Sequence, residues 1–169
     1  MRNLTEKNQP KITGEPIIRV FDAQREKVWK VWTEPEYVKR WWGPRDFTAP
    51  YISIDLRVGS KFVYCMRGAG PDGVVKDWWN TGKHLEIVHM KKIVASMSFA
   101  DENGNPVPAS HYEMPGEWPM ETMLTVTFED AEAGKTKIIV REDGVPSETA
   151  EFARLGWEQQ FDKIAELLK

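Results

Sequence analysis

The sequence is short of cysteine, of long apolar runs and of any charge excess. Its 169 residues include one cysteine, Cys65, so no disulfide can form within the chain. That is typical of a reducing compartment. The first residues are polar and lack the apolar centre of a signal peptide, so we expect a cytoplasmic protein. No apolar run approaches the roughly 20 residues of a membrane helix, and we expect no membrane association.

Charges of the two signs nearly balance. The chain has 23 Lys and Arg against 26 Asp and Glu, a formal net charge of -3. This composition gives no electrostatic reason to expect a nucleic-acid partner or an anionic membrane. The length fits a single domain with a sizeable core. We predict a flexible N-terminal arm over residues 1–15 and one domain over residues 16–169.

Metal ligands are also scarce. The three histidines are His84, His89 and His111, whereas structural zinc sites usually take four ligands. His84 and His89 are five residues apart in a predicted strand, so their side chains point to opposite faces. We therefore expect no metal and no cofactor. His84, in the middle of that strand, either enters the interior as a polar group or is an ordinary satisfied or solvent-facing histidine.

Signatures of covalent catalysis are missing as well. The GxSxG motif is absent. Cys65 has no visible base or electropositive setting, which favours a buried thiol over a nucleophile. Three acidic residues in a proline-rich stretch are expected to be solvated: Glu113, Glu117 and Glu121. We therefore expect a protein that is not an enzyme.

The segment "GAGPDG", residues 68–73, spells GxGxxG. A dinucleotide site needs a helix to begin at this point, so that its N-terminus can hold the pyrophosphate. Here Pro71-Asp72-Gly73 is typical of a turn, and "VVKDWW" after it favours a strand. We predict a β-hairpin and not a nucleotide site.

The first third of the chain predicts one strand and two short helices. "PIIRVFDA" has the apolar, β-branched composition of a strand. "QREKVWKVWTEPEYVKRWWGP" changes to helical spacing, with a helix boundary at Thr33–Pro35 and an end at Gly43-Pro44. Neighbours on a helix point about 100° apart. Of the pair Trp41 and Trp42, we expect one side chain in the core and the other at the rim.

From Phe47 onward the apolar period becomes two, which predicts six strands in three antiparallel pairs. Turns are expected at residues 57–60, 68–73, 90–92 and 131–134. Residues 101–119, rich in Pro, Gly, Asn and Glu, predict a long exposed loop. After Pro146 a long helix is expected, with Ser147 as its N-cap. Its core-facing stripe is Trp157, Phe161, Ile164 and Leu168.

Four stretches of this sequence resemble one known family: "FDAQREKVWKVWTEPEYVKRWWGP", "VGSKFVYCMRGAGPDG", "GKHLEIVHMKKIV" and "ARLGWEQQFDKIAELL". The family is the activator of heat-shock protein 90 ATPase homologues, within the START-like or SRPBCC superfamily, and the resemblance covers roughly residues 16–168. It implies an α+β helix-grip fold. In that fold a seven-stranded antiparallel sheet wraps on a long C-terminal helix, with two short helices after the first strand. The superfamily commonly has an apolar cavity between helix and sheet.

Large apolar residues alternate onto one face of two predicted strands, and they either fill a core or wall a cavity. The resemblance favours the cavity. The predicted wall comprises Phe62, Tyr64, Met66, His84, Ala95, Met97, Phe99, Leu155 and Trp157. We expect binding of a small hydrophobic molecule without covalent catalysis. The alternatives are a chaperone-associated interaction module of the heat-shock protein 90 type, with a chaperone or other protein as partner, and an enzyme of the aromatic-cyclase type.

Overall fold

The structure is a computed structural model that describes residues 15–169. The predicted arm, residues 1–15, lies outside that range except for Glu15. In chain order the elements are β1 (Ile17–Phe21), α1 (Arg25–Thr33), α2 (Pro35–Val38), β2 (Thr48–Ser53), β3 (Lys61–Ala69), β4 (Val75–Val88), β5 (Lys92–Ala100), β6 (Pro106–Val107), the 3-10 helix η2 (Ala109–Tyr112), β7 (Thr122–Asp130), the 3-10 helix η3 (Glu132–Gly134), β8 (Thr136–Asp143) and α3 (Ser147–Leu167).

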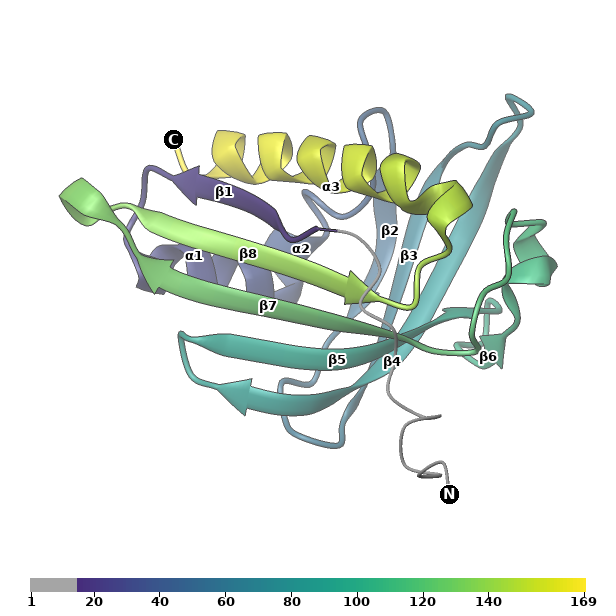
Figure 1. Cartoon of the computed structure of the whole chain (residues 1–169), viewed down its shortest axis with the longest axis horizontal. Helices are drawn as coiled ribbons and strands as arrows, with labels where there is room; N and C mark the ends of the chain where they lie inside the picture. The colour runs from purple at the N-terminus through teal and green to yellow at the C-terminus, as the bar shows by residue number, and fades with distance from the viewer. Residues whose placement is uncertain (1–14) are drawn as a thin grey trace, which may run out of the picture.

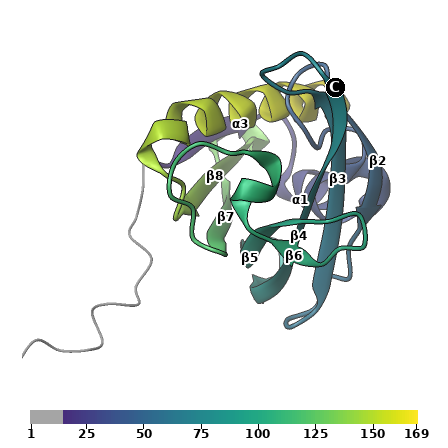
Figure 2. The same ribbon diagram turned by 90° about the vertical axis from the view of Figure 1, so that its right-hand side faces the viewer.

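Seven strands form one antiparallel sheet in the order β1-β8-β7-β5-β4-β3-β2, and the short β6 pairs with β5 beside this path. The sheet curls into a half-barrel, and α3 lies along its open side (Figures 1 and 2). The predicted helix-grip fold and the hairpin at residues 68–73 are therefore confirmed. The curl gives the sheet a concave face, where the core and the candidate site lie.

One glycine makes the close approach of β4 to β5 possible. A side-chain carbon built on Gly82 would lie 1.8 Å from the carbonyl oxygen of Ser96 and 2.6 Å from the ring of Phe62. No side chain fits at those distances, so only glycine lets the ring of Phe62 lie over this part of the sheet. A register shift between His84 and Glu86 then bends β4 further.

The second half of α3 seals the core. Phe161 and Ile164 are fully buried, and Trp157 and Leu168 nearly so. This is the predicted stripe, and its spacing of four, three and four residues keeps it on one side of the helix. The ring of Phe161 meets that of Phe21 edge to face at 5.8 Å. The predicted N-cap is wrong by one residue: Pro146 holds that position and Ser147 is already helical.

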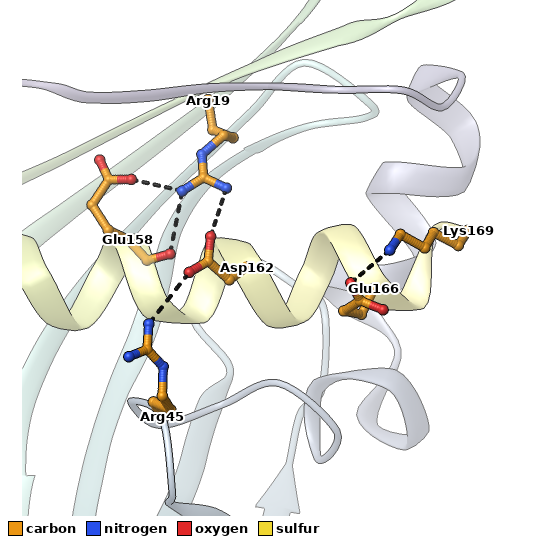
Figure 3. A network of polar contacts seen from close by, with 6 residues as sticks. All are labelled: Arg19, Arg45, Glu158, Asp162, Glu166 and Lys169. Carbon is orange, nitrogen blue, oxygen red and sulfur yellow. Dashed lines mark hydrogen bonds and ion pairs between the residues drawn. The ribbon is translucent and has the colours of Figure 1, made fainter.

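Charged side chains tie α3 to the edge of the sheet. Arg19 of β1 forms ion pairs with Glu158 at 2.7 Å and Asp162 at 3.0 Å, and Arg45 approaches Asp162 at 3.9 Å (Figure 3). These groups are at least partly exposed to solvent, so each pair contributes only about 0–1 kcal/mol. The pairs fix the direction of the helix, while the buried stripe supplies most of its stability.

The paired tryptophans that follow α2 are both buried, so the rim position predicted for one of them is wrong. Trp41 is 1 % exposed and Trp42 is 7 % exposed. The prediction assumed that both belong to the helix, but α2 ends at Val38. In the turn that follows, both rings face inward, and Gly43 takes the expected left-handed conformation with φ of 99°. Trp41, Trp42, Trp32 and Trp157 form one aromatic cluster, with ring centroids 4.9 to 6.1 Å apart.

Residues 101–119 differ from the exposed loop that we predicted. The segment contains β6 and η2, and Ala109 is buried. The hydroxyl of Tyr112 donates to the carbonyl of Ala100 at 2.5 Å and accepts from the amide of Trp79 at 3.0 Å, while its ring stacks on Trp78. The composition of this segment is typical of a loop, but composition does not report the single tyrosine that docks it. The segment lies at one end of the half-barrel, near the start of α3 (Figure 2).

Candidate functional site

The first half of α3 leaves space above the sheet. The helix side chains between it and the sheet are small here: Ala153 and Gly156, beside Thr149. Because they do not reach the strands, a groove of about 190 Å³ remains between α3, the concave face of the sheet and the segment before β7. Its walls are Trp42, Pro44, Met66, Asn80, Met97, Ser98, Phe99, Met114, Trp118, Pro119, Met120, Thr122, Glu142, Thr149, Phe152, Ala153, Gly156, Trp157 and Gln160.

The segment before β7 forms the outer wall of this groove. The Trp118 ring meets Phe99 edge to face at 5.3 Å, and its indole N–H donates to the carbonyl of Pro115 at 2.9 Å. Two apolar side chains at the groove are exposed: Phe152 is 67 % exposed and Met120 is 50 % exposed. Exposed apolar side chains of this kind mark ligand-binding grooves and protein contact surfaces alike.

Polar groups occupy defined places in the groove. The indole N–H of Trp157 donates to Oε1 of Glu142. Burial raises the pKa of the Glu142 carboxyl, and the bond from Trp157 only partly offsets that rise. Gln160 accepts the amide of Gly43 through Oε1 at 2.8 Å, and Nδ2 of Asn80 donates to the carbonyl of Ser98 at 3.5 Å.

A smaller inner cavity of about 40 Å³ lies behind the groove. Trp42, Met97 and Trp157 line both spaces and stand between them. Two of its wall residues, Trp42 and His84, each have a buried nitrogen without a hydrogen-bond partner, Nε1 and Nδ1 respectively. The volume of the cavity exceeds the roughly 10–15 Å³ that one water molecule needs, so it has room for water or for the polar group of a ligand.

Hydrogen bonds from α3 hold Trp42 in place. Nζ of Lys163 donates to the carbonyls of Gly43, Pro44 and Phe47, each at 2.9 Å. Burial lowers the pKa of this ammonium group, and the nearby carboxylate of Asp46 raises it in part. The turn after Trp42 is therefore anchored to the helix that covers the groove, which fixes the spacing between the groove's two sides.

The structure places eight of the nine predicted wall residues in three groups. Phe62, Tyr64, His84 and Ala95 line the inner cavity; Met66 and Phe99 line the groove; Met97 and Trp157 line both. Leu155 lines neither and is 53 % exposed, so its assignment is wrong. Residues two apart on a helix point about 200° away from each other. Because Trp157 faces inward, Leu155 faces the solvent.

Sequence reasoning missed two kinds of groove residue. Glu142 and Gln160 are polar residues with no motif around them, and nothing in the sequence separates them from solvated residues. The wall residues Met114, Trp118 and Met120 lie in or just after the stretch taken for an exposed loop. A tryptophan and two methionines among prolines and glycines were the available signal, since exposed loops rarely need large apolar side chains.

The remaining candidate residues from the sequence, a cysteine and three glutamates, lie outside the groove. Cys65 is fully buried, and burial raises the pKa of its thiol to about 11, as expected for an unreactive cysteine. Glu113, Glu117 and Glu121 are exposed. Within residues 15–169 no group of three His, Cys, Asp or Glu side chains is placed to hold a metal ion. In the same range, no helix is long and apolar enough to cross a membrane.

A curled antiparallel sheet covered by one long helix, with a groove beneath that helix, defines a START-like helix-grip domain. More narrowly, the chain belongs to the family described as Activator of Hsp90 ATPase homolog 1-like protein, whose sequence model matches residues 22–169. The resemblance drawn from the sequence is therefore confirmed. No curated protein matches the chain.

Several solved structures share this fold. Protein Ms6760 from Mycobacterium smegmatis has a TM-score of 0.71 and 21% identity, over 91% of this chain and 89% of that chain. Protein CV1439 from Chromobacterium violaceum has a TM-score of 0.70 and 24% identity, over 91% and 95%. The AHSA1 (SPO3351) protein from Silicibacter pomeroyi has a TM-score of 0.69 and 15% identity, over 91% and 96%. At these identities the likeness shows the fold alone.

Proposed function

We propose that this protein binds a compact apolar molecule in the groove beneath the first half of α3. The observation that carries the proposal is the composition of the groove walls. Four methionines and five aromatic residues line it: Met66, Met97, Met114, Met120, Trp42, Phe99, Trp118, Phe152 and Trp157. Methionine side chains adapt to ligands of different shape, and aromatic rings offer large apolar surfaces. All nine border the groove, Phe152 and Met120 as exposed side chains and Trp42 and Trp157 as largely buried ones.

The volume of the groove sets the size of the ligand. At about 190 Å³ it is slightly larger than an engineered apolar cavity of about 150 Å³ that binds benzene. A ligand with one to three small rings, or a short branched chain, fits this space. Binding is favourable because the apolar walls lose their contact with water when the ligand enters.

We propose binding without turnover. Acid–base chemistry is usually organised by pairs of titratable groups whose environments separate their pKa values. Among the described residues that line the groove, Glu142 is the single ionisable side chain. The same observation favours a binding protein over the aromatic-cyclase alternative, because the other polar wall residues are uncharged and supply no second titratable group: Asn80, Ser98, Thr122, Thr149 and Gln160.

Calorimetric titration with 1-adamantanol, a compact neutral probe, tests the proposal. The wild-type protein should bind it saturably at one site, and Met97→Trp should abolish binding because the larger ring fills the space between groove and inner cavity. Ala153→Leu fills the groove from the helix side and should also abolish binding, so it replaces Met97→Trp as the test variant if Met97→Trp does not fold. Leu155→Trp is the matched control: it adds the same ring on the exposed side of α3 and should bind like the wild type. Equal binding by all variants would place the ligand elsewhere and contradict the proposal.

A further inference from the structure

Glu142 stands out among the groove residues because it is the only ionisable side chain among the described residues that line the groove. It borders a space in which nine of the other 18 wall residues are methionine, tryptophan or phenylalanine. A carboxylate in such surroundings needs a charged or hydrogen-bonding partner, because burial of an unpaired charge is costly.

The protein supplies only part of that partnership. The indole N–H of Trp157 donates to one carboxyl oxygen of Glu142. Among the described residues, no basic side chain forms an ion pair with Glu142 within 4.0 Å. Arg154 lines a pocket on the other side of Glu142, but Glu15 and Glu151 line that pocket too. Burial accordingly raises the pKa of Glu142, and no basic side chain is among the causes that act on it.

We propose that the groove selects apolar molecules that carry an ammonium group, with Glu142 as the counter-ion. This inference rests on the proposed function and adds the charge of the ligand to it. A cation near Glu142 gains a charge-assisted hydrogen bond in a partly desolvated site. Trp42 and Trp157 line the same groove, and aromatic rings attract cations over their faces. A carboxylate ligand would instead face a like charge, or would have to bind together with a proton.

Besides Arg154, the N-terminus of α3 is a feature near the groove that favours an anion. The positive end of a helix dipole acts over about the first turn. Trp157, which holds the carboxyl of Glu142, is ten residues beyond Ser147, or about 15 Å along the helix axis. The first turn also carries its own acidic residue, Glu148. The acidic side chain of Glu148 offsets the positive end of the dipole, so the dipole does not replace a cation as the partner of Glu142.

Three probes with the same apolar cage isolate the charge: 1-adamantylamine, 1-adamantanol and 1-adamantanecarboxylic acid, titrated calorimetrically at pH 7. In the wild type the amine should bind at least tenfold more tightly than the acid, with the alcohol between them. Glu142→Gln keeps the acceptor for Trp157 but removes the charge, so the ratio of amine to alcohol affinity should fall close to one. Glu117→Gln removes a carboxylate from the exposed part of the same wall and should leave that ratio unchanged.

The outcomes separate this inference from the proposed function. If the alcohol binds but the acid binds as tightly as the amine, the groove is a ligand site and the assignment of charge is wrong. A preference for the amine that survives Glu142→Gln, or that Glu117→Gln also removes, would overturn the role of Glu142. Failure of all three probes to bind would count against the proposed function itself. If Glu142→Gln does not fold, the ranking in the wild type still decides between cation and anion.

Discussion

The two halves of α3 face the same curled sheet, but the second half fills the space above it and the first half leaves a groove. From Trp157 to the C-cap residue Leu168, large side chains fill the space above the strands, and Phe161 and Ile164 are fully buried. From Ser147 to Gly156 it places small side chains such as Ala153 toward the sheet, and a groove of about 190 Å³ remains. Trp157 stands at the boundary, packed on Trp32 on one side and bonded to Glu142 on the other.

The difference shows how one helix provides both stability and a binding site. Large apolar residues on the second half exclude water and hold the helix to the sheet, so the first half need not contribute to the core. Whole domains are stable by only about 5–15 kcal/mol. An unfilled groove is therefore compatible with a stable fold only where the rest of the contact between helix and sheet is well packed. We therefore expect substitutions in the second half to change stability and those in the first half to change binding.

The largest effect is expected for Phe161→Ala. Phe161 is fully buried against Phe21 and lies beneath the guanidinium of Arg19, 5.5 Å from the ring centre. Removing a ring from such a site leaves a cavity and should lower the free energy of unfolding by about 3–5 kcal/mol. Urea denaturation measures the change. A loss below about 1 kcal/mol would mean that the second half of α3 does not seal the core.

A smaller loss is expected for Tyr112→Phe at the outer wall of the groove. The substitution removes the bond to the carbonyl of Ala100 and leaves the amide of Trp79 without its acceptor. Leaving buried partners unsatisfied costs about 1–3 kcal/mol. Limited proteolysis should also cut residues 101–119 faster in the variant. Unchanged stability together with unchanged cleavage would show that the segment is not docked by this tyrosine.

Phe152→Ala reverses the pattern expected for Phe161→Ala. Phe152 lines the groove but is 67 % exposed, so its removal should change the free energy of unfolding by no more than about 0.5 kcal/mol. Binding of 1-adamantanol should weaken, because an apolar wall is lost. Melting curves and titrations on the same samples test both parts. A large loss of stability without a change in affinity would show that the first half of α3 contributes to the core in the same way as the second half.

The smallest effect is a change in the pH dependence of stability caused by Glu142→Gln. Burial raises the pKa of Glu142 above its ordinary value of 4.5, so the folded protein holds this proton more tightly than the unfolded chain does. The stability contributed by that proton is present in acid and is lost as pH rises through the folded pKa. The stability of the variant relative to wild type should therefore increase between pH 4.5 and pH 7. An equal difference at both pH values would contradict the buried setting of Glu142.

The fold could be predicted because its signals are local and periodic. Alternating apolar residues in β3 and β5 indicated strands, and they also put Phe62, Tyr64, Ala95 and Met97 on the concave face. The stripe of α3 was equally readable from its spacing. Periodicity does not report where a short helix ends, so it did not predict that Trp41 and Trp42 are both buried.

The candidate site was less predictable because it depends on contacts between distant segments. Glu142 at the end of β8 meets Trp157 only after α3 has packed on the sheet. The wall built by Trp118 depends on the docking of Tyr112 against β4 and β5. The assignment of Leu155 to the wall conflicts with the geometry of the helix. Residues two apart point in nearly opposite directions, so the inward position of Trp157 means that Leu155 faces outward.

The most direct test of the central claim is a proton–nitrogen NMR titration that follows the tryptophan indole N–H signals as 1-adamantanol is added. Trp157 and Trp42 line the groove, whereas Trp29 is buried against Phe128 in the sealed part of the core. The groove beneath the first half of α3 predicts saturable shifts of the Trp157 and Trp42 signals and a stationary Trp29 signal. Shifts of Trp29 without shifts of Trp157 and Trp42, or no shift in any of the three, would contradict it.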